Sequence, residues 1–107
     1  MADPDHETWL LNTGDRVVAK KSAQGFSSLT PFERLVYCLW IMDYAMRNAG
    51  DLMTADDLHP SFMLDGKAAA QALGLQYAMA AFELSTAELE QRYFSLFDDI
   101  LIEVRSA

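Results

Sequence analysis

Apolar residues return every three or four positions along two long segments of the chain, the spacing that one face of an α-helix produces. The first segment follows Thr30 to Glu33, where a capping threonine, a proline and a glutamate three residues after the cap signal a helix start. The second follows Ser85 to Glu88, which carries the same capping box. We therefore predict two core helices, near 31–48 and 86–104. Their apolar positions are Phe32, Leu35, Val36, Leu39, Trp40 and Met46 in the first, and Leu89, Tyr93, Leu96, Phe97, Ile100, Leu101 and Val104 in the second.

Shorter helical pieces are predicted around these two segments. A segment from about Asp5 to Gln24 carries an apolar face, but Asn12-Thr13-Gly14 weakens its middle, which leaves open one helix or two short pieces. Thr54 to Asp57 resembles another helix cap and would open a short helical turn. Two further helices are expected over 61–73 and 75–83.

No segment shows the alternation of apolar and polar residues, bounded by turn residues, that indicates a β-strand. The predicted fold class is therefore all-α, a single compact bundle of five or six helices. At 107 residues the chain has the size of one domain. We expect one helical domain over 1–107, made of an N-terminal helical segment over 1–25 and a core over 29–105.

The only cysteine, Cys38, lies inside the apolar run Leu35 to Met42 and is expected to be a buried structural residue. Trp40, in the same run, and Leu96 are expected to be buried as well. A lone cysteine excludes an internal disulfide, and the acidic N-terminus does not resemble a signal peptide. The apolar run is also too short to span a bilayer. We therefore expect a cytoplasmic protein with no membrane partner.

The net charge of −8 is concentrated in the second half of the chain. Residues 1–50 contain five Lys or Arg and six Asp or Glu, whereas residues 51–107 contain three and ten. Such a surface repels phosphate, so direct binding to nucleic acid is not expected, whereas a basic protein partner is favoured. Ordinary solvation of a small protein produces the same excess of charge. The acidic residues that we select as candidates for partner binding are Asp51, Asp56, Asp57, Asp65, Glu88, Asp98, Asp99 and Glu103.

No group of residues has the spacing of an active site. The two histidines, His6 and His59, are far from Cys38 in the sequence, and no glycine is followed by the Lys-Ser or Lys-Thr of a phosphate-binding loop. No catalytic residue, metal ligand or cofactor is predicted. The alternative is a small metal-dependent enzyme or hydrolase built on the acidic loop 51–59, although its spacing is not that of an EF-hand. That loop would supply Asp51, Asp56, Asp57 and His59.

Several short motifs resemble one protein family. Leu29 to Trp40 leads into Asn48-Ala49-Gly50, an alanine-rich helix then ends in Ala72-Leu73-Gly74, and Phe94 to Asp98 follows. This order, over roughly residues 29–100, is similar to that of the small acidic all-helical bacterial DNA-mimic family. The mark of that family is an Asn-Gly-Gly turn after the first core helix.

Within that turn, Asn48 and Gly50 match the family, whereas Ala49 replaces the first glycine. Ala45 and Asp51 stand where the family has a glutamate and an aromatic residue. The resemblance implies an all-α fold, a homodimer, no enzymatic activity, and a structural turn formed by Asn48 and Gly50. It also implies an acidic surface that sequesters a DNA-binding protein.

We therefore expect a non-enzymatic interaction protein that presents an acidic helical surface to a basic protein partner. The partner would be a DNA-binding protein, sequestered by DNA mimicry, or a toxin, neutralised by an immunity protein. In both cases electrostatic steering would set the association rate, and a smaller apolar patch would supply the affinity.

Overall fold

The two capping boxes begin the two long core helices where the sequence predicts them. In the computed structural model, which describes residues 4–107, Thr30 precedes α2 (Pro31–Ala49) and Ser85 precedes α6 (Thr86–Arg105). Each cap side chain accepts a hydrogen bond from the backbone N–H of a glutamate three residues later, and each glutamate side chain accepts one from the cap backbone. These bonds satisfy N–H groups that the first helical turn leaves without partners.

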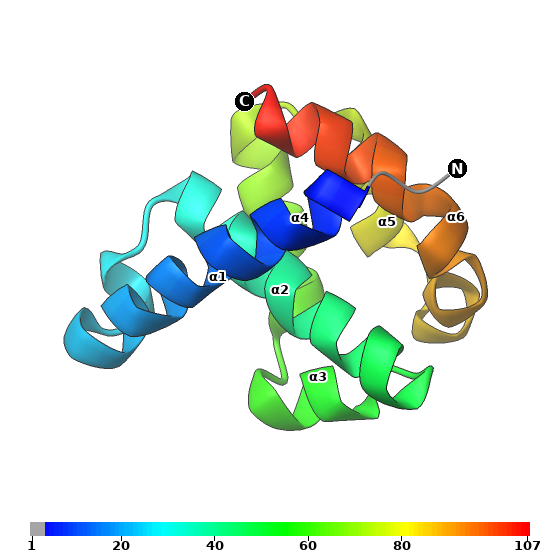
Figure 1. The fold of residues 1–107 in the computed structure, drawn as a ribbon, viewed down its shortest axis with the longest axis horizontal. Coiled ribbons are helices and arrows are strands. Elements are labelled where there is room, and N and C mark those ends of the chain that lie inside the picture. The colour runs from blue at the N-terminus through cyan, green and yellow to red at the C-terminus, as the bar shows by residue number, and fades with distance from the viewer. Residues whose placement is uncertain (1–3) are drawn as a thin grey trace.

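Four further α-helices and a short 3-10 turn complete the described part of the chain (Figure 1). Residues 4–107 contain six α-helices and no β-strand, which confirms the predicted all-α bundle. None of these helices is long and apolar enough to cross a membrane. The first three residues of the expected N-terminal segment lie outside the described residues. The remaining elements are α1 (Pro4–Gln24), η1 (Phe26–Ser28), α3 (Met53–Leu58), α4 (Phe62–Leu73) and α5 (Gln76–Glu83).

Helix α2 lies in the middle of the bundle, and α1, α3 and α4 each pack against it (Figure 1). Helix α5 connects α4 to α6, and α6 also contacts α1. The core face of α2 includes Leu39 and Met42, and Cys38 is buried beside them, as predicted. The prediction that Trp40 and Leu96 are buried was wrong, because both lie at the margins of their helices' apolar faces and are only partly covered.

Helix α1 is continuous across Asn12-Thr13-Gly14, where the sequence left open whether one helix or two short pieces would form. Gly14 is buried, and Trp40 of α2 packs directly against it: a Cβ built on Gly14 would lie 2.1 Å from Trp40 Cδ1. Because Gly14 has no side chain, α1 and α2 approach closely at this point. Tertiary packing therefore holds the helix through a residue of poor helix propensity.

Helix α3 begins at Met53, so the prediction that Thr54 opens it was wrong. Thr54 lies inside the helix, and the Asp51 side chain accepts the Met53 N–H at 3.1 Å. Gly50 and Gly74 end α2 and α4 in the left-handed conformation, with φ angles of 73° and 70°. Both helix ends agree with the sequence prediction, because glycine adopts this conformation at little cost.

Candidate functional site

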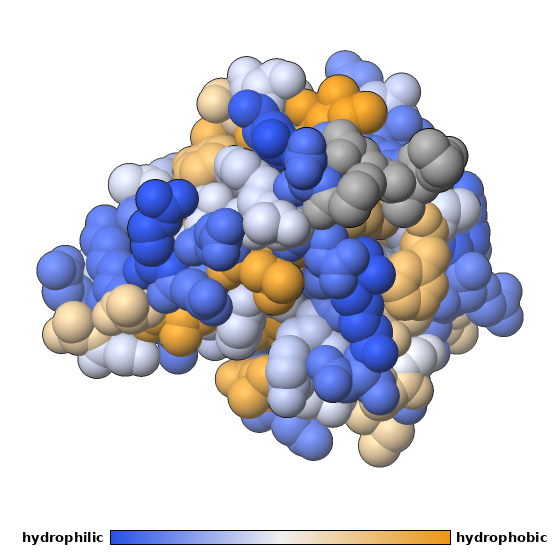
Figure 2. Space-filling model, in the orientation of Figure 1, coloured by the Kyte–Doolittle hydropathy of each residue, from blue (hydrophilic) through white to orange (hydrophobic). Residues whose placement is uncertain are grey.

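The eight acidic residues selected from the sequence lie on three helices, α3, α4 and α6, and on the turn before α3. Asp98 and Asp99 are adjacent in α6 and diverge by about 100° around the helix axis. Asp56 and Asp57 are adjacent in α3, and both line a groove between α3, α4 and α6. On the face shown in Figure 2, hydrophilic areas are separated by apolar and intermediate ones. The candidate residues therefore divide into groups with different surroundings.

Four of the eight carboxylates accept hydrogen bonds that stabilise helix ends and turns. Glu88 completes the capping box of α6, and Glu103 accepts the backbone N–H of Tyr77 at 2.9 Å, so that it caps the start of α5. Asp65 bonds a serine and a histidine that precede α4, and Asp51 accepts the first N–H of α3. The capping box was visible in the sequence, whereas the role of Glu103 was not, because it depends on the packing of α6 against α5.

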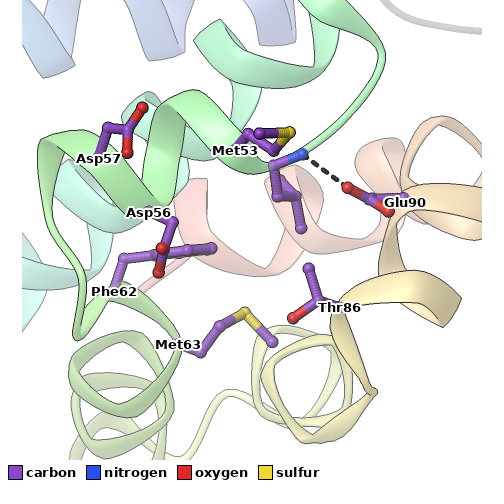
Figure 3. A pocket seen from close by; sticks show the side chains of 8 residues that line it. Met53, Asp56, Asp57, Phe62, Met63, Thr86 and Glu90 are labelled. Atoms are coloured by element: carbon purple, nitrogen blue, oxygen red, sulfur yellow. Dashed lines mark hydrogen bonds between the residues drawn. The ribbon is translucent and has the colours of Figure 1, made fainter.

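The groove lies between α3, α4 and the first turn of α6, and its volume is about 330 Å³. Its floor is apolar: Leu52 and Phe62 are buried, and Met63 points into the space from α4 (Figure 3). Met53, at the edge, is 72% exposed, and Thr86 faces the same space from α6. The groove is thus an apolar depression open to solvent.

Three carboxylates line this groove, those of Asp56, Asp57 and Glu90, and no Lys, Arg or His of the described residues does so. Glu90 Oε2 accepts the Leu52 backbone N–H at 2.8 Å, which holds this carboxylate at the entrance to α3 (Figure 3). Asp56 points toward the groove, whereas Asp57 points away from its centre. Glu90 was not selected from the sequence, because the bond that places it joins residues 38 positions apart.

His59, the fourth member of the alternative enzymatic site, pairs with an acid outside the loop 51–59. Its Nε2 lies 2.6 Å from Asp65 Oδ2, and the Ser61 hydroxyl donates to the same oxygen at 2.7 Å. A nucleophilic triad needs the serine and the acid on opposite ring nitrogens of the histidine, whereas Ser61 and Asp65 both face Nε2. Within residues 4–107, no three His, Cys, Asp or Glu side chains are grouped so that they could hold a metal ion. The described loop therefore assembles neither a triad nor a metal site.

Burial and hydrogen bonding set the charge states of two further groups. Partial burial favours the neutral form of Asp65, but hydrogen bonds from Ser61 and His59 hold its pKa below the ordinary value. Burial, with a smaller contribution from the negative charge of Asp65, raises the pKa of the Cys38 thiol to about 12. At neutral pH Cys38 is therefore a thiol and not a thiolate nucleophile.

A buried polar network that the sequence analysis did not single out joins three helices. Asp43 of α2 is 3% exposed and accepts the Tyr93 hydroxyl of α6 at 2.6 Å. Arg47 Nε donates to both Asp43 oxygens, at 2.9 and 3.0 Å, and lies 3.6 Å from Glu7 of α1. The spacing of four between Asp43 and Arg47 was the signal in the sequence, but Tyr93 lies 50 positions from Asp43. Because its carboxylate is enclosed, the network holds helices together and presents no reacting group.

The network predicts a pH dependence of stability. Burial raises the pKa of Asp43, and the hydrogen bond from Tyr93 and the charge of Arg47 only partly oppose this shift. Stabilisation by protonated Asp43 is therefore complete below the ordinary pKa of 3.8 and is lost as the pH rises through the raised pKa. We expect the difference in unfolding free energy between wild type and Asp43→Asn, measured in urea, to shrink as the pH rises through this window. A difference that grows with pH would contradict a raised pKa.

Comparison of the chain with protein-family models, with curated proteins and with solved structures finds no match. The resemblance to the DNA-mimic family therefore depends on the sequence motifs alone, and the homodimer and the sequestering surface that it implies stay predictions. In the structure, the Asn48 side-chain amide donates to the Tyr44 carbonyl at 2.7 Å, and Gly50 ends α2. Asn48 and Gly50 thus lie at the C-terminal end of α2.

Proposed function

We propose that this chain is a non-enzymatic interaction protein that presents an acidic helical surface, centred on the groove, to a basic protein partner. The observation that carries the proposal is the lining of the groove, where three carboxylates and no basic side chain of the described residues border an apolar floor. Two of these carboxylates, Asp56 and Asp57, were selected from the sequence. Glu90 adds the third from another helix.

A surface of this kind favours a cationic protein over a nucleic acid. The net charge of −8 attracts basic groups and repels phosphate, over a range of about 8 Å at physiological ionic strength. The charges would orient and accelerate the encounter, while burial of the exposed Met53 side chain and of an apolar group of the partner would supply affinity. A DNA-binding protein sequestered by DNA mimicry and a toxin neutralised by an immunity protein both fit this description.

The proposal places this encounter in the cytoplasm. The only cysteine is a buried free thiol, so the fold needs no oxidising compartment. The family resemblance adds a homodimer, which would present the groove twice.

Replacing Asp56 and Asp57 with asparagine should slow association with the basic partner and flatten its dependence on salt. Exposed charges at the rim of an interface act mainly on the association rate. The partner is captured from native lysate on immobilised wild-type protein at low salt and identified. Its association rate is then measured by stopped flow at several ionic strengths. We expect a reduction of roughly tenfold at low salt that disappears at high salt.

The matched control is Asp15→Asn combined with Asp99→Asn, which removes the same charge from two exposed positions outside the groove. Asp99 was selected from the sequence as a candidate for partner binding, so this control also tests whether Asp99 of α6 contributes to association with the partner. We expect nearly wild-type rates for the control pair. Equal slopes of rate against ionic strength for wild type and the groove variant would refute the proposal, as would equal slowing by both pairs.

A further inference from the structure

We infer that the partner inserts one large apolar side chain into the groove and that lysine or arginine residues flank this side chain in the partner's sequence. The inference rests on the proposed function and names the recognition element: a short basic segment of a protein with an apolar anchor at its centre. The size of the groove, the chemistry of its floor and the placement of its carboxylates each support this occupant.

The groove has room for a side chain but not for a secondary-structure element. Its volume is about 330 Å³. A cavity of about 150 Å³ holds a benzene molecule, whereas an α-helix with its side chains is about 10 Å across. An aromatic or leucine-sized group therefore fits, together with part of the backbone that carries it.

The floor is suited to an apolar group that arrives from solvent. Leu52 and Phe62 are 1% and 3% exposed and form a surface that is already in place. Met53 and Met63 lie beside it, one at the exposed edge and one partly buried. Methionine side chains adapt to the shape of a ligand and make favourable contacts with aromatic rings. An anchor in the groove would therefore remove both its own apolar surface and that of Met53 from water.

The carboxylates stand on two sides of this floor. Asp56 faces the groove from α3, and Glu90 faces it from α6 (Figure 3). The hydrogen bond from the Leu52 N–H already orders the Glu90 carboxylate, so a partner does not have to immobilise it. In an extended segment, the residues before and after an anchor lead away from it in opposite directions. A cation on each side of the anchor would therefore meet a carboxylate on each side of the groove.

The test uses two fluorescein-labelled peptides of equal charge, Gly-Ser-Lys-Arg-Phe-Lys-Arg-Ser-Gly and the same peptide with serine in place of phenylalanine. Binding to the wild-type protein is measured by fluorescence anisotropy at low ionic strength. We expect the phenylalanine peptide to bind about tenfold more tightly, a difference of about 1.4 kcal/mol. Asp56→Asn combined with Asp57→Asn should weaken both peptides by a similar factor, because it leaves the floor unchanged.

Two variants test the anchor itself. Thr86→Trp fills the groove from an exposed position in the first turn of α6 and should bring the ratio of the two peptide affinities close to one. Met53→Ser removes apolar surface at a position that is 72% exposed, so the fold should persist and the preference should fall several-fold. A thermal melt by circular dichroism checks that both variants are folded.

The outcomes separate this inference from the proposed function. Equal affinity of the two peptides for the wild-type protein would overturn the apolar anchor. The groove would then be an acidic surface that binds cations without an apolar contact. If replacing Asp56 and Asp57 with asparagine left both peptide affinities unchanged, the proposed function would be overturned together with this inference. Absence of binding of either peptide to the wild-type protein at low salt would refute both.

Discussion

Asp43→Ala is expected to lower the free energy of unfolding by about 2–4 kcal/mol. The substitution leaves the hydroxyl of Tyr93, a residue only 1% exposed, without its acceptor, and removes the two hydrogen bonds from Arg47. Arg47 is partly exposed and keeps Glu7 within reach, so most of the cost comes from the buried hydroxyl and the lost volume. Because a small domain is stable by about 5–15 kcal/mol, a urea melt would show a large shift of its midpoint.

A double-mutant cycle with Tyr93→Phe provides the control. Tyr93→Phe alone should cost about 1–2 kcal/mol, because Asp43 keeps its bonds to Arg47. In the double variant the phenylalanine no longer carries a hydroxyl that needs an acceptor. The combined cost should therefore be smaller than the sum of the single costs. Strictly additive costs would show that the Tyr93–Asp43 bond does not couple α6 to α2 in solution.

Gly14→Ala should destabilise the protein by about 1–3 kcal/mol, although alanine favours a helix over glycine by about 1 kcal/mol. The added Cβ would lie 2.1 Å from Trp40 Cδ1 and 2.6 Å from Cγ, well inside contact distance. These atoms lie near the base of the indole, so the ring cannot avoid the overlap by a small rotation. Either Trp40 leaves its place or α1 and α2 separate, and both outcomes lose packing. Thermal or urea melts measure the difference.

Two further variants separate helix propensity from packing at this crossing. Asn12→Ala, at an exposed position of the same helix, should stabilise the protein by a few tenths of a kcal/mol. Combining Gly14→Ala with Trp40→Ala should cost less than the two single substitutions together, because alanine lacks the Cγ and Cδ1 atoms that the new methyl group would meet. A stabilising effect of Gly14→Ala alone would contradict the close approach of the two helices.

Most helix boundaries could be predicted because their signals are local. Thr30 and Ser85 each form a capping box with a residue three positions away, and Gly50 ends a helix through its own backbone conformation. The same reasoning failed at Thr54, where the Asp51 side chain bonds the first N–H of α3. Asp and Thr are both good capping residues, and the sequence alone did not show which of the two would act.

The candidate site was predictable only in part. The sequence indicated an acidic second half and selected Asp56 and Asp57 within it, but it gave equal weight to Glu88 and Glu103. Packing decides between these residues, since Asp56 and Asp57 line the groove, whereas Glu88 and Glu103 do not. The apolar floor beside Asp56 was not predicted from the sequence, because it joins residues at the start of α3 to residues of α4.

By itself, the sequence determined the all-α class, the starts of the two core helices and the glycine-terminated helix ends. Capping, periodicity and glycine conformation act between residues no more than about four positions apart, so a local pattern is sufficient. Only the tertiary structure decided that Glu103 caps α5, that Glu90 joins the groove and that Tyr93 satisfies Asp43. These hydrogen bonds join residues 26, 38 and 50 positions apart. They exist because helix packing brings such distant positions together, and no local pattern specifies that packing.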